Sequence, residues 1–258
     1  MKKTSDIIRK LEIGKEKPKI CIPLVSRSLK DLLKEAALLK EIPCDLAEWR
    51  ADYFDGLEDP DALASALPTI QEALGQIPLL FTIRTRPEGG EIDLSPAAYL
   101  RCNQQALESG IPAMADAELT KGNTIMQAMA EIAHGCGAAL IGSRHDFHKT
   151  PSGAEIIESL CQMNALGADI SKYAVMPQTP RDVLTLLDAT LTMKEKYPDI
   201  PVVTMSMGKL GGISRITGGI FGSCITFGAA RTASAPGQLP ARQLDEFLTA
   251  LQLLSEAI

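Results

Sequence analysis

Short apolar runs recur eight times along this chain of 258 residues, and longer segments with helical periodicity separate them. The runs cover residues 20–25, 45–50, 79–85, 113–119, 138–144, 172–176, 201–206 and 223–227. Alternating strand and helix patterns favour parallel strands joined by crossover helices, and eight such strands close a barrel. We therefore expect a single α/β domain over residues 1–258, folded as a (β/α)8 TIM barrel.

The same alternation also suits an open doubly wound sheet, which is the alternative fold. No G-x-G-x-x-G fingerprint follows the first run, and its absence weakens the nucleotide-binding version of that sheet. The last segment, residues 241–258, is amphipathic and long enough to complete an outer ring of helices. The stretch before residue 20 holds Gly14 and Pro18 and predicts a short N-terminal β-hairpin over the barrel floor.

Composition excludes several classes of protein. With 45% hydrophobic and 22% charged residues the chain is typical of a soluble globular protein, and its net charge of -6 argues against a nucleic-acid surface. No run approaches the roughly 18 apolar residues of a membrane span, and no secretory signal is evident. The six cysteines stand singly and pair with no histidine at ligand spacing, so we expect a cytoplasmic protein without a metal site.

Lys172 opens the sixth apolar run, where a positive charge has no ordinary structural purpose. An amine held in partly desolvated surroundings, or next to other cations, loses its proton near neutral pH and can attack a carbonyl carbon. Lys172 is therefore a candidate Schiff-base nucleophile. The alternative is a lysine at the end of a strand whose amine reaches solvent.

His145 follows the fifth run and precedes Lys172 by 27 residues, which is one strand–helix unit. In a barrel the two side chains would be neighbours at the same rim. A histidine next to an amine nucleophile can move protons in either direction near pH 7. Alone, His145 suits a structural hydrogen-bonding role; together with Lys172 it becomes a candidate general acid/base.

Charged residues recur two positions apart on three of the runs, which places each pair on one face of its strand. The pairs are Glu48 with Arg50, Arg84 with Arg86, and Asp116 with Glu118. Inward-facing charges must pair with one another or with a ligand, because an unpaired buried charge is costly. The set predicts a polar pocket at the carboxyl ends of the strands, with a structural ion-pair network as the alternative.

Further candidates follow the seventh and eighth runs. Met205 and Met207 share a strand face and would pack against a bound carbon ring or fill the core. The glycine-rich stretch 208–219 carries Arg215, which would grip a carboxylate by two parallel hydrogen bonds or contribute to a phosphate site. Residues 232–238 predict a mobile lid with hydrogen-bonding tips.

Taken in order, these motifs closely resemble those of the type I 3-dehydroquinate dehydratases, the Schiff-base lyases of the shikimate pathway. The resemblance covers nearly the whole chain. It rests on Glu48-Trp-Arg50, Phe81-Thr-Ile-Arg84 with Glu88-Gly-Gly, Ser143-Arg-His145-Asp-Phe, Lys172-Tyr-Ala-Val-Met-Pro-Gln, Met205-Ser-Met-Gly, Ile213-Ser-Arg215, Phe221-Gly-Ser and Ala233-Ser-Ala-Pro-Gly-Gln238.

The resemblance implies a (β/α)8 barrel that is usually a homodimer and uses no metal or organic cofactor. It implies that Lys172 forms an imine with the C3 ketone of 3-dehydroquinate, and that His145 removes a C2 proton and then protonates the departing C1 hydroxyl. Glu88 would orient His145. The remaining substrate contacts would come from Glu48, Arg50 and Arg84 at the ring hydroxyls and from Arg215, Ser234 and Gln238 at the carboxylate.

Two positions depart from the family pattern. Many members have a glutamate where Gly219 stands, and some have a serine near the ligand at the position of Pro23. Two rival functions stay open. A Schiff-base aldolase on the same barrel would use Arg215 to grip a phosphate. A barrel that only binds a carboxylated metabolite would need neither Lys172 nor His145, so the presence of both argues against it.

Overall fold

The computed structural model describes residues 11–14, 17–230 and 235–256. In this part of the chain eight parallel strands form one sheet in the order β7-β6-β5-β4-β3-β2-β1-β8. The strands are β1 (Lys19–Leu24), β2 (Leu46–Arg50), β3 (Leu79–Thr82), β4 (Met114–Glu118), β5 (Ala139–Asp146), β6 (Ile170–Val175), β7 (Val202–Ser206) and β8 (Ile225–Phe227).

The two ends of this sheet meet. Val202 of β7 forms a parallel bridge with Ser223, and the amide of Cys224 donates a hydrogen bond of 2.8 Å to the carbonyl of Val202. On its other side β8 pairs with β1, where Lys19 lies opposite Ile225. The sheet is therefore nearly closed, which leaves almost no free strand edge. The predicted (β/α)8 barrel is confirmed.

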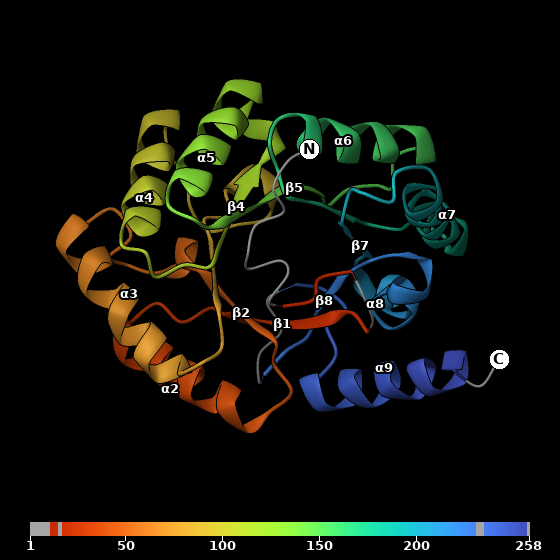
Figure 1. The fold of residues 1–258 in the computed structure, drawn as a ribbon, viewed down its shortest axis with the longest axis horizontal. Coiled ribbons are helices and arrows are strands. Elements are labelled where there is room, and N and C mark those ends of the chain that lie inside the picture. Colours follow the sequence, from red (N-terminus) through yellow and green to blue (C-terminus); the bar gives the residue numbers. More distant parts are fainter. Residues whose placement is uncertain (1–10, 15–16, 231–234, 257–258) are drawn as a thin grey trace.

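Helices surround the strands as an outer ring (Figure 1). They are α2 (Leu29–Leu38), α3 (Pro60–Leu74), α4 (Pro96–Glu108), α5 (Asn123–Gly135), α6 (Gly153–Ala165), α7 (Pro180–Lys196), α8 (Gly208–Phe221) and α9 (Ala241–Glu256). Several begin with a side-chain cap: Ser95, for example, accepts a hydrogen bond from the amide of Ala98, and Pro96 occupies the first turn. Within the described residues no helix is both long and apolar enough to cross a membrane.

Some predicted boundaries were wrong. Strand β6 begins at Ile170, two residues before the predicted start, so Lys172 lies inside the strand. Strand β3 ends at Thr82 because the next backbone amides turn away from the ladder: those of Arg84 and Thr85 donate to the carboxylates of Asp52 and Glu118.

The glycine-rich stretch 208–219, interpreted as a possible phosphate cradle, lies within the regular helix α8. The predicted N-terminal hairpin lies largely on residues 1–10 and 15–16, which are outside the described residues, so it stays a prediction. Residues 11–14 form a turn, and Ile13 packs against the apolar side chains inside the barrel.

The barrel interior divides into an apolar lower part and a polar upper part. Strand alternation points every second residue inward. Near the amino ends of the strands these residues are apolar and fully buried, among them Leu46, Leu80, Met114, Ile170 and Val203. The next inward residues are charged or polar on four of these strands, and on β7 the next one is a methionine; they are Glu48, Thr82, Asp116, Lys172 and Met205. Apolar side chains therefore fill the lower half of the barrel, and charged and polar side chains gather in the upper half.

Candidate active site

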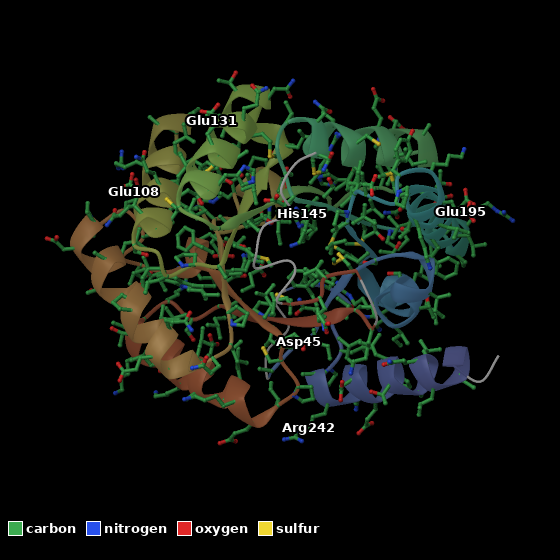
Figure 2. All side chains as sticks on the ribbon, in the orientation of Figure 1. Asp45, Glu108, Glu131, His145, Glu195 and Arg242 are labelled. Atoms are coloured by element: carbon green, nitrogen blue, oxygen red, sulfur yellow. The ribbon has the colours of Figure 1, made fainter. Side chains whose placement is uncertain are left out.

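A pocket lies at the carboxyl ends of the strands, inside the ring of helices, where His145 is labelled in Figure 2. Nine of the ten predicted site residues line it: Glu48, Arg50, Arg84, Glu88, His145, Lys172, Met205, Arg215 and Gln238. The tenth, Ser234, lies outside the described residues, as do residues 232 and 233 of the predicted lid. The lining also includes Met207, for which the sequence left contact with a bound ring or core packing open, and Phe147 and Phe227, which the sequence reasoning did not assign to the site.

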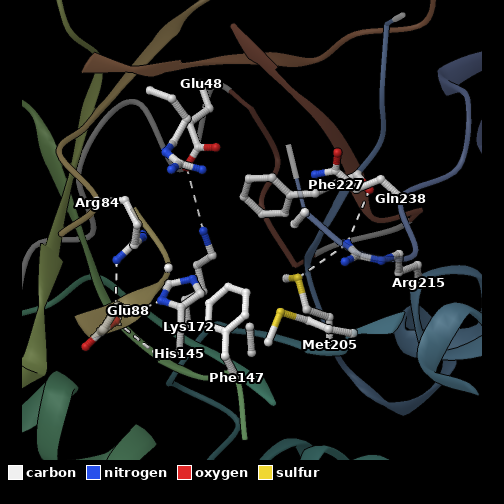
Figure 3. A pocket seen from close by; sticks show the side chains of 15 residues that line it. Glu48, Arg84, Glu88, His145, Phe147, Lys172, Met205, Arg215, Phe227 and Gln238 are labelled. Carbon is white, nitrogen blue, oxygen red and sulfur yellow. Dashed lines mark hydrogen bonds and ion pairs between the residues drawn. The ribbon is translucent and has the colours of Figure 1, made fainter. Parts of the chain in front are cut away.

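Strand register brings Lys172 and His145 into the same cavity. Lys172 of β6 lies opposite Ser143 of β5, and His145 lies two residues further along β5 on the same inward face. Both side chains point into the pocket (Figure 3). Lys172 is only 4% exposed, so the alternative of a strand-end lysine that reaches solvent is wrong.

The amine of Lys172 lies among weak contacts. Its Nζ is 3.7 Å from Oε1 of Glu48 and 3.9 Å from Oδ2 of Asp116, and it lies 4.1 Å from the centroid of the Phe227 ring. These distances are longer than a hydrogen bond, so none of the residues that the structure describes holds the nitrogen tightly. The two carboxylates and the aromatic face can nevertheless stabilise a positive charge at this position.

His145 is oriented by Glu88. Its Nδ1 lies 2.9 Å from Oε2 of Glu88, and its backbone amide donates to the same oxygen at 3.1 Å. Burial, with the nearby charges of Arg84, Lys172 and Arg50, lowers the pKa of His145 well below its ordinary value. The imidazole is therefore neutral at pH 7. With its Nδ1 proton directed at Glu88, its Nε2 has a free lone pair that can accept a proton.

Glu88 is itself buried and held by a tight turn. Burial raises the pKa of its carboxyl to about 7, and the opposing effect of Arg84, whose Nη1 is 3.5 Å away, does not cancel this. The turn depends on the two glycines that follow. Gly89 has a φ of +80°, and a side chain at Gly90 would place its Cβ 1.9 Å from the carbonyl oxygen of Arg84.

Arg84 is the centre of an ion-pair network. Its guanidinium lies 2.9 Å from Asp116 and 3.1 Å from Glu118, and it donates to the hydroxyl of Ser143. These carboxylates, with Glu88, raise the pKa of Arg84 well above its ordinary value in spite of burial. On this side of the pocket the charged residues therefore do form a structural ion-pair network, which was the alternative to direct substrate contact. Arg84 nevertheless also lines the cavity.

Arg50 is paired as well, by a residue that the sequence reasoning missed. Asp52 accepts two parallel hydrogen bonds of 2.8 Å from the guanidinium of Arg50. The same carboxylate accepts from the backbone amides of Arg84 and Glu91, so it ties three segments of the pocket rim together. Asp52 follows Arg50 at the two-residue spacing that flagged the other charged pairs, and that spacing was the available signal.

Arg215 has no such partner. It projects from helix α8, is 2% exposed, and among the described residues it forms no ion pair. Its guanidinium contacts the Sδ of Met205 at 3.5 Å and donates to the carbonyl oxygens of Phe227 and Pro236. Burial lowers the pKa of Arg215 to about 10. A buried cation without a counter-ion favours the entry of an anion.

The two positions that depart from the family pattern lie away from this pocket. A Cβ at Gly219 would lie 2.3 Å from Cγ of Pro18, so the bare glycine allows Pro18 to pack against helix α8. Pro23 is buried in β1 and borders a different cavity, together with Leu24, Glu35 and Ala230. Within the described residues no cluster of three or more His, Cys, Asp or Glu side chains could hold a metal ion.

Comparisons with known proteins agree with one another. A family model described as type I 3-dehydroquinase matches residues 20–255. The 3-dehydroquinate dehydratase of Bacillus licheniformis is 46% identical over 241 residues, which cover 93% of this chain and 95% of that protein. The enzyme of that name from Klebsiella pneumoniae is 48% identical over 232 residues, covering 90% of this chain and 92% of its own.

A solved structure is similar over the same length. The type I 3-dehydroquinate dehydratase from Clostridium difficile, described with covalent modified comenic acid, matches with a TM-score of 0.91 and 43% identity. The match covers 95% of this chain and 96% of that one. A likeness of this extent includes the strands and loops that form the pocket.

Proposed function

The chain belongs to the type I 3-dehydroquinase family, and we propose that its pocket dehydrates 3-dehydroquinate to 3-dehydroshikimate through an imine on Lys172. The protein is a hydro-lyase of the shikimate pathway that acts on a small-molecule substrate. The observation that carries the mechanism is the placement of a buried, loosely held amine and a neutral imidazole on the inward faces of neighbouring strands.

In the first step the neutral amine of Lys172 attacks the C3 carbonyl carbon. A C–N bond forms, and the nitrogen gives up one of its two protons. The carbonyl oxygen takes that proton and a second one from solvent and leaves as water, so that a protonated imine results. Glu48 and Asp116, each within 4 Å of Nζ, support the proposal because their charges stabilise this cation. The protonated imine can then accept the electron pair of the C2–H bond, which makes that proton removable.

His145 performs both proton transfers in the second step. Its Nε2 takes the C2 proton, and the electron pair moves into the imine to give an enamine. The imidazolium then gives its proton to the C1 hydroxyl, which leaves as water while the C1=C2 bond forms. Hydrolysis of the product imine releases 3-dehydroshikimate and returns Lys172 to its amine form. The lowered pKa of His145 supports its role as the base.

The remaining pocket residues are assigned to binding. Arg215 grips the substrate carboxylate, assisted by Gln238 and Ser234, and the absence of an ion pair to Arg215 among the described residues supports this role. Glu48, Arg84 and Arg50 face the ring hydroxyls, and Met205 packs against the ring carbons. The phosphate-binding aldolase is the weaker candidate, because the family model and the relatives that match this chain are dehydroquinases.

We further propose that residues 1–258 act as one domain in the cytoplasm and pair as a homodimer. Eight large apolar side chains are at least 40% exposed in the described part of the chain, and all of them lie on α7, α8, α9 or directly after α7. They are Leu184, Tyr197, Leu210, Ile213, Ile220, Phe247, Leu253 and Leu254. An apolar face of this extent is typical of an association surface, and a second copy is its proposed occupant.

The mechanism is tested by trapping the imine. Purified protein is mixed with 3-dehydroquinate and sodium borohydride, and intact mass and peptide mapping locate any adduct. We expect a stable adduct on Lys172, together with the absorbance of the conjugated product before reduction. In His145→Ala the adduct should still form while turnover stalls. An adduct on another residue, or none in an active preparation, would refute the covalent mechanism.

A further inference from the structure

Thr120 connects the buried Glu88 with the surface of the protein. It lies in the short helix η4 (Leu119–Lys121), directly after β4, and its side chain is exposed. Its hydroxyl donates a hydrogen bond to Oε1 of Glu88. The other carboxylate oxygen, Oε2, serves His145 through Nδ1 and the backbone amide. The two oxygens of Glu88 therefore have separate partners, one on η4 and one on β5.

The surroundings of Glu88 make its negative charge difficult to maintain. Arg84 at the end of β3 is the cation nearest to it, yet Arg84 is shared with Asp116 and Glu118 of β4. On its other side Glu88 faces His145 of β5. One guanidinium thus serves three carboxylates, so Glu88 readily takes up a proton. A threonine hydroxyl that donates to the carboxylate favours the ionised form.

The charge state of Glu88 decides which nitrogen of His145 carries the proton. An ionised Glu88 can only accept, so it holds the proton on Nδ1 and leaves Nε2 free as a base. A protonated Glu88 can donate to Nδ1 instead, which places the imidazole proton on Nε2 and removes the base from the pocket. The hydrogen bond from Thr120 therefore influences Nε2 of His145 indirectly, through the carboxylate of Glu88 and the Nδ1 atom of the imidazole.

We propose that Thr120 is a positioning residue for the dehydration, whose hydroxyl holds Glu88 in the orientation and charge state that keep Nε2 of His145 free to accept the C2 proton. This inference rests on the role of His145 proposed above. No contact of Thr120 with substrate is involved. Its exposed position means that its replacement leaves no cavity in the core and no buried group of its own without a partner.

The test compares Thr120→Val, which keeps the shape but lacks the hydroxyl, with Thr120→Ser, which keeps the hydroxyl. kcat/KM is measured from pH 5 to pH 9. We expect the acidic limb of the Thr120→Val profile to move upward by about one pH unit, which is a loss of roughly tenfold at pH 6 and little change at pH 9. Thr120→Ser should restore the profile of the unchanged protein. Thr120→Ala replaces the valine variant if the latter does not fold.

Two outcomes would overturn the inference. An unmoved acidic limb would show that the hydroxyl does not act on the Glu88–His145 pair, and an equal loss at every pH would show a merely structural role. Borohydride trapping separates these failures from a failure of the proposed function. If the unchanged protein gives the Lys172 adduct while the profile of Thr120→Val stays in place, only the role of Thr120 is wrong.

Discussion

Two buried arginines on opposite sides of the pocket show how differently one barrel can treat the same side chain (Figure 3). Arg84 lies among Asp116, Glu118 and Glu88, which raise its pKa. Arg215 is as deeply buried, but its contacts among the described residues are a thioether and backbone carbonyls, and burial lowers its pKa to about 10. On the first side the guanidinium is paired with carboxylates of the protein, whereas on the second no carboxylate of the described residues pairs with it.

The two sides of the pocket therefore contribute differently when substrate binds. On the Arg84 side the network is already assembled, so it can orient Glu88 and His145 without rearrangement when substrate arrives. On the Arg215 side the desolvation of the guanidinium has already occurred, so an entering carboxylate gains a strong, specific pairing. Lys172 stands between the two sides, with Glu48 and Asp116 on one and Phe227 on the other.

The largest expected effect comes from the residue between the two sides. Lys172→Ala should lower kcat by at least about 10⁴-fold, because no other described amine lines the pocket and the imine cannot form. Substrate should still bind, since the arginines on both sides are intact. Steady-state kinetics and isothermal titration measure the two quantities. Retained turnover would contradict the covalent mechanism, and lost binding would show that Lys172 holds the two sides together.

Replacement of the paired arginine should damage the fold. Arg84→Ala leaves three buried carboxylates without their shared cation, so we expect the free energy of unfolding to fall by about 3–5 kcal/mol. Urea denaturation at pH 7.5 measures the change. Arg84→Lys is the matched control, because it keeps the charge but loses the forked geometry, and it should be destabilised less. Equal stability of the alanine variant and the unchanged protein would contradict the account of this network.

The titration of Glu88, on the Arg84 side of the pocket, makes the free energy of unfolding depend on pH. Its folded-state pKa of about 7 lies above the ordinary value of 4.5, so the folded protein holds this proton more strongly than the unfolded chain does. The resulting stability is fully present below pH 4.5 and is lost as the pH rises through 7. Glu88→Gln, which cannot titrate, should therefore gain stability relative to the unchanged protein as the pH rises.

We expect that gain to reach up to about 3 kcal/mol between pH 5 and pH 8, measured by urea denaturation of both proteins at each pH. Activity should fall at the same time, because glutamine holds the Nδ1 proton of His145 less firmly. If the difference in unfolding free energy between Glu88→Gln and the unchanged protein is the same at every pH, Glu88 is ionised over the whole range. Its contacts would then stabilise the carboxylate enough to offset the cost of its burial.

Replacement of the unpaired arginine should act on binding and not on the fold. Arg215→Ala removes a buried cation that has no carboxylate partner among the described residues, so the free energy of unfolding should stay the same or rise. The KM for 3-dehydroquinate should increase by about 10- to 100-fold, the effect of one lost charge-assisted pairing. Arg215→Lys, as control, should recover part of this loss. A strongly destabilised Arg215→Ala would abolish the contrast with Arg84.

The features of the fold and of the site that depend on local sequence pattern could be predicted from the sequence. Strand alternation predicted the barrel, and the two-residue spacing of charges predicted the inward faces of β2 and β4. The same spacing was wrong for Arg84 and Arg86, because β3 has ended and the side chain of Arg86 is 66% exposed.

Lys172 and His145 were predicted to be neighbours because their separation matches one strand–helix unit, and strand register does bring both into one cavity. The pairing of Arg84 was not predicted, because it depends on which carboxylates of β4 lie within reach. The pairing of Arg50 with Asp52 had a local signal in the two-residue spacing, which was overlooked.

The missed residues share a physical cause. Thr120 is a polar residue in a turn, and its hydrogen bond to Glu88 joins two segments 32 positions apart. Phe227 reads as an ordinary apolar strand residue, and only the closed barrel places its ring against the amine of Lys172. The end of β3 was missed because Asp52, which follows β2, and Glu118 of β4 accept hydrogen bonds from the backbone amides that come after Thr82. No local pattern contains such contacts.

The smallest expected effect tests whether the Arg215 side depends on the family's common glutamate. Gly219→Glu would place its Cβ against Pro18, 2.3 Å from Cγ, so we expect a loss of stability of about 1–3 kcal/mol. The matched control is Gly212→Glu on the same helix, where a Cβ meets nothing within 4 Å. The KM of folded Gly219→Glu should be unchanged, because Pro18 keeps position 219 away from the pocket. A lowered KM would instead show that the new carboxylate reaches Arg215 and improves its placement. The absence of a carboxylate partner would then weaken substrate binding by Arg215 in this chain and would not favour it.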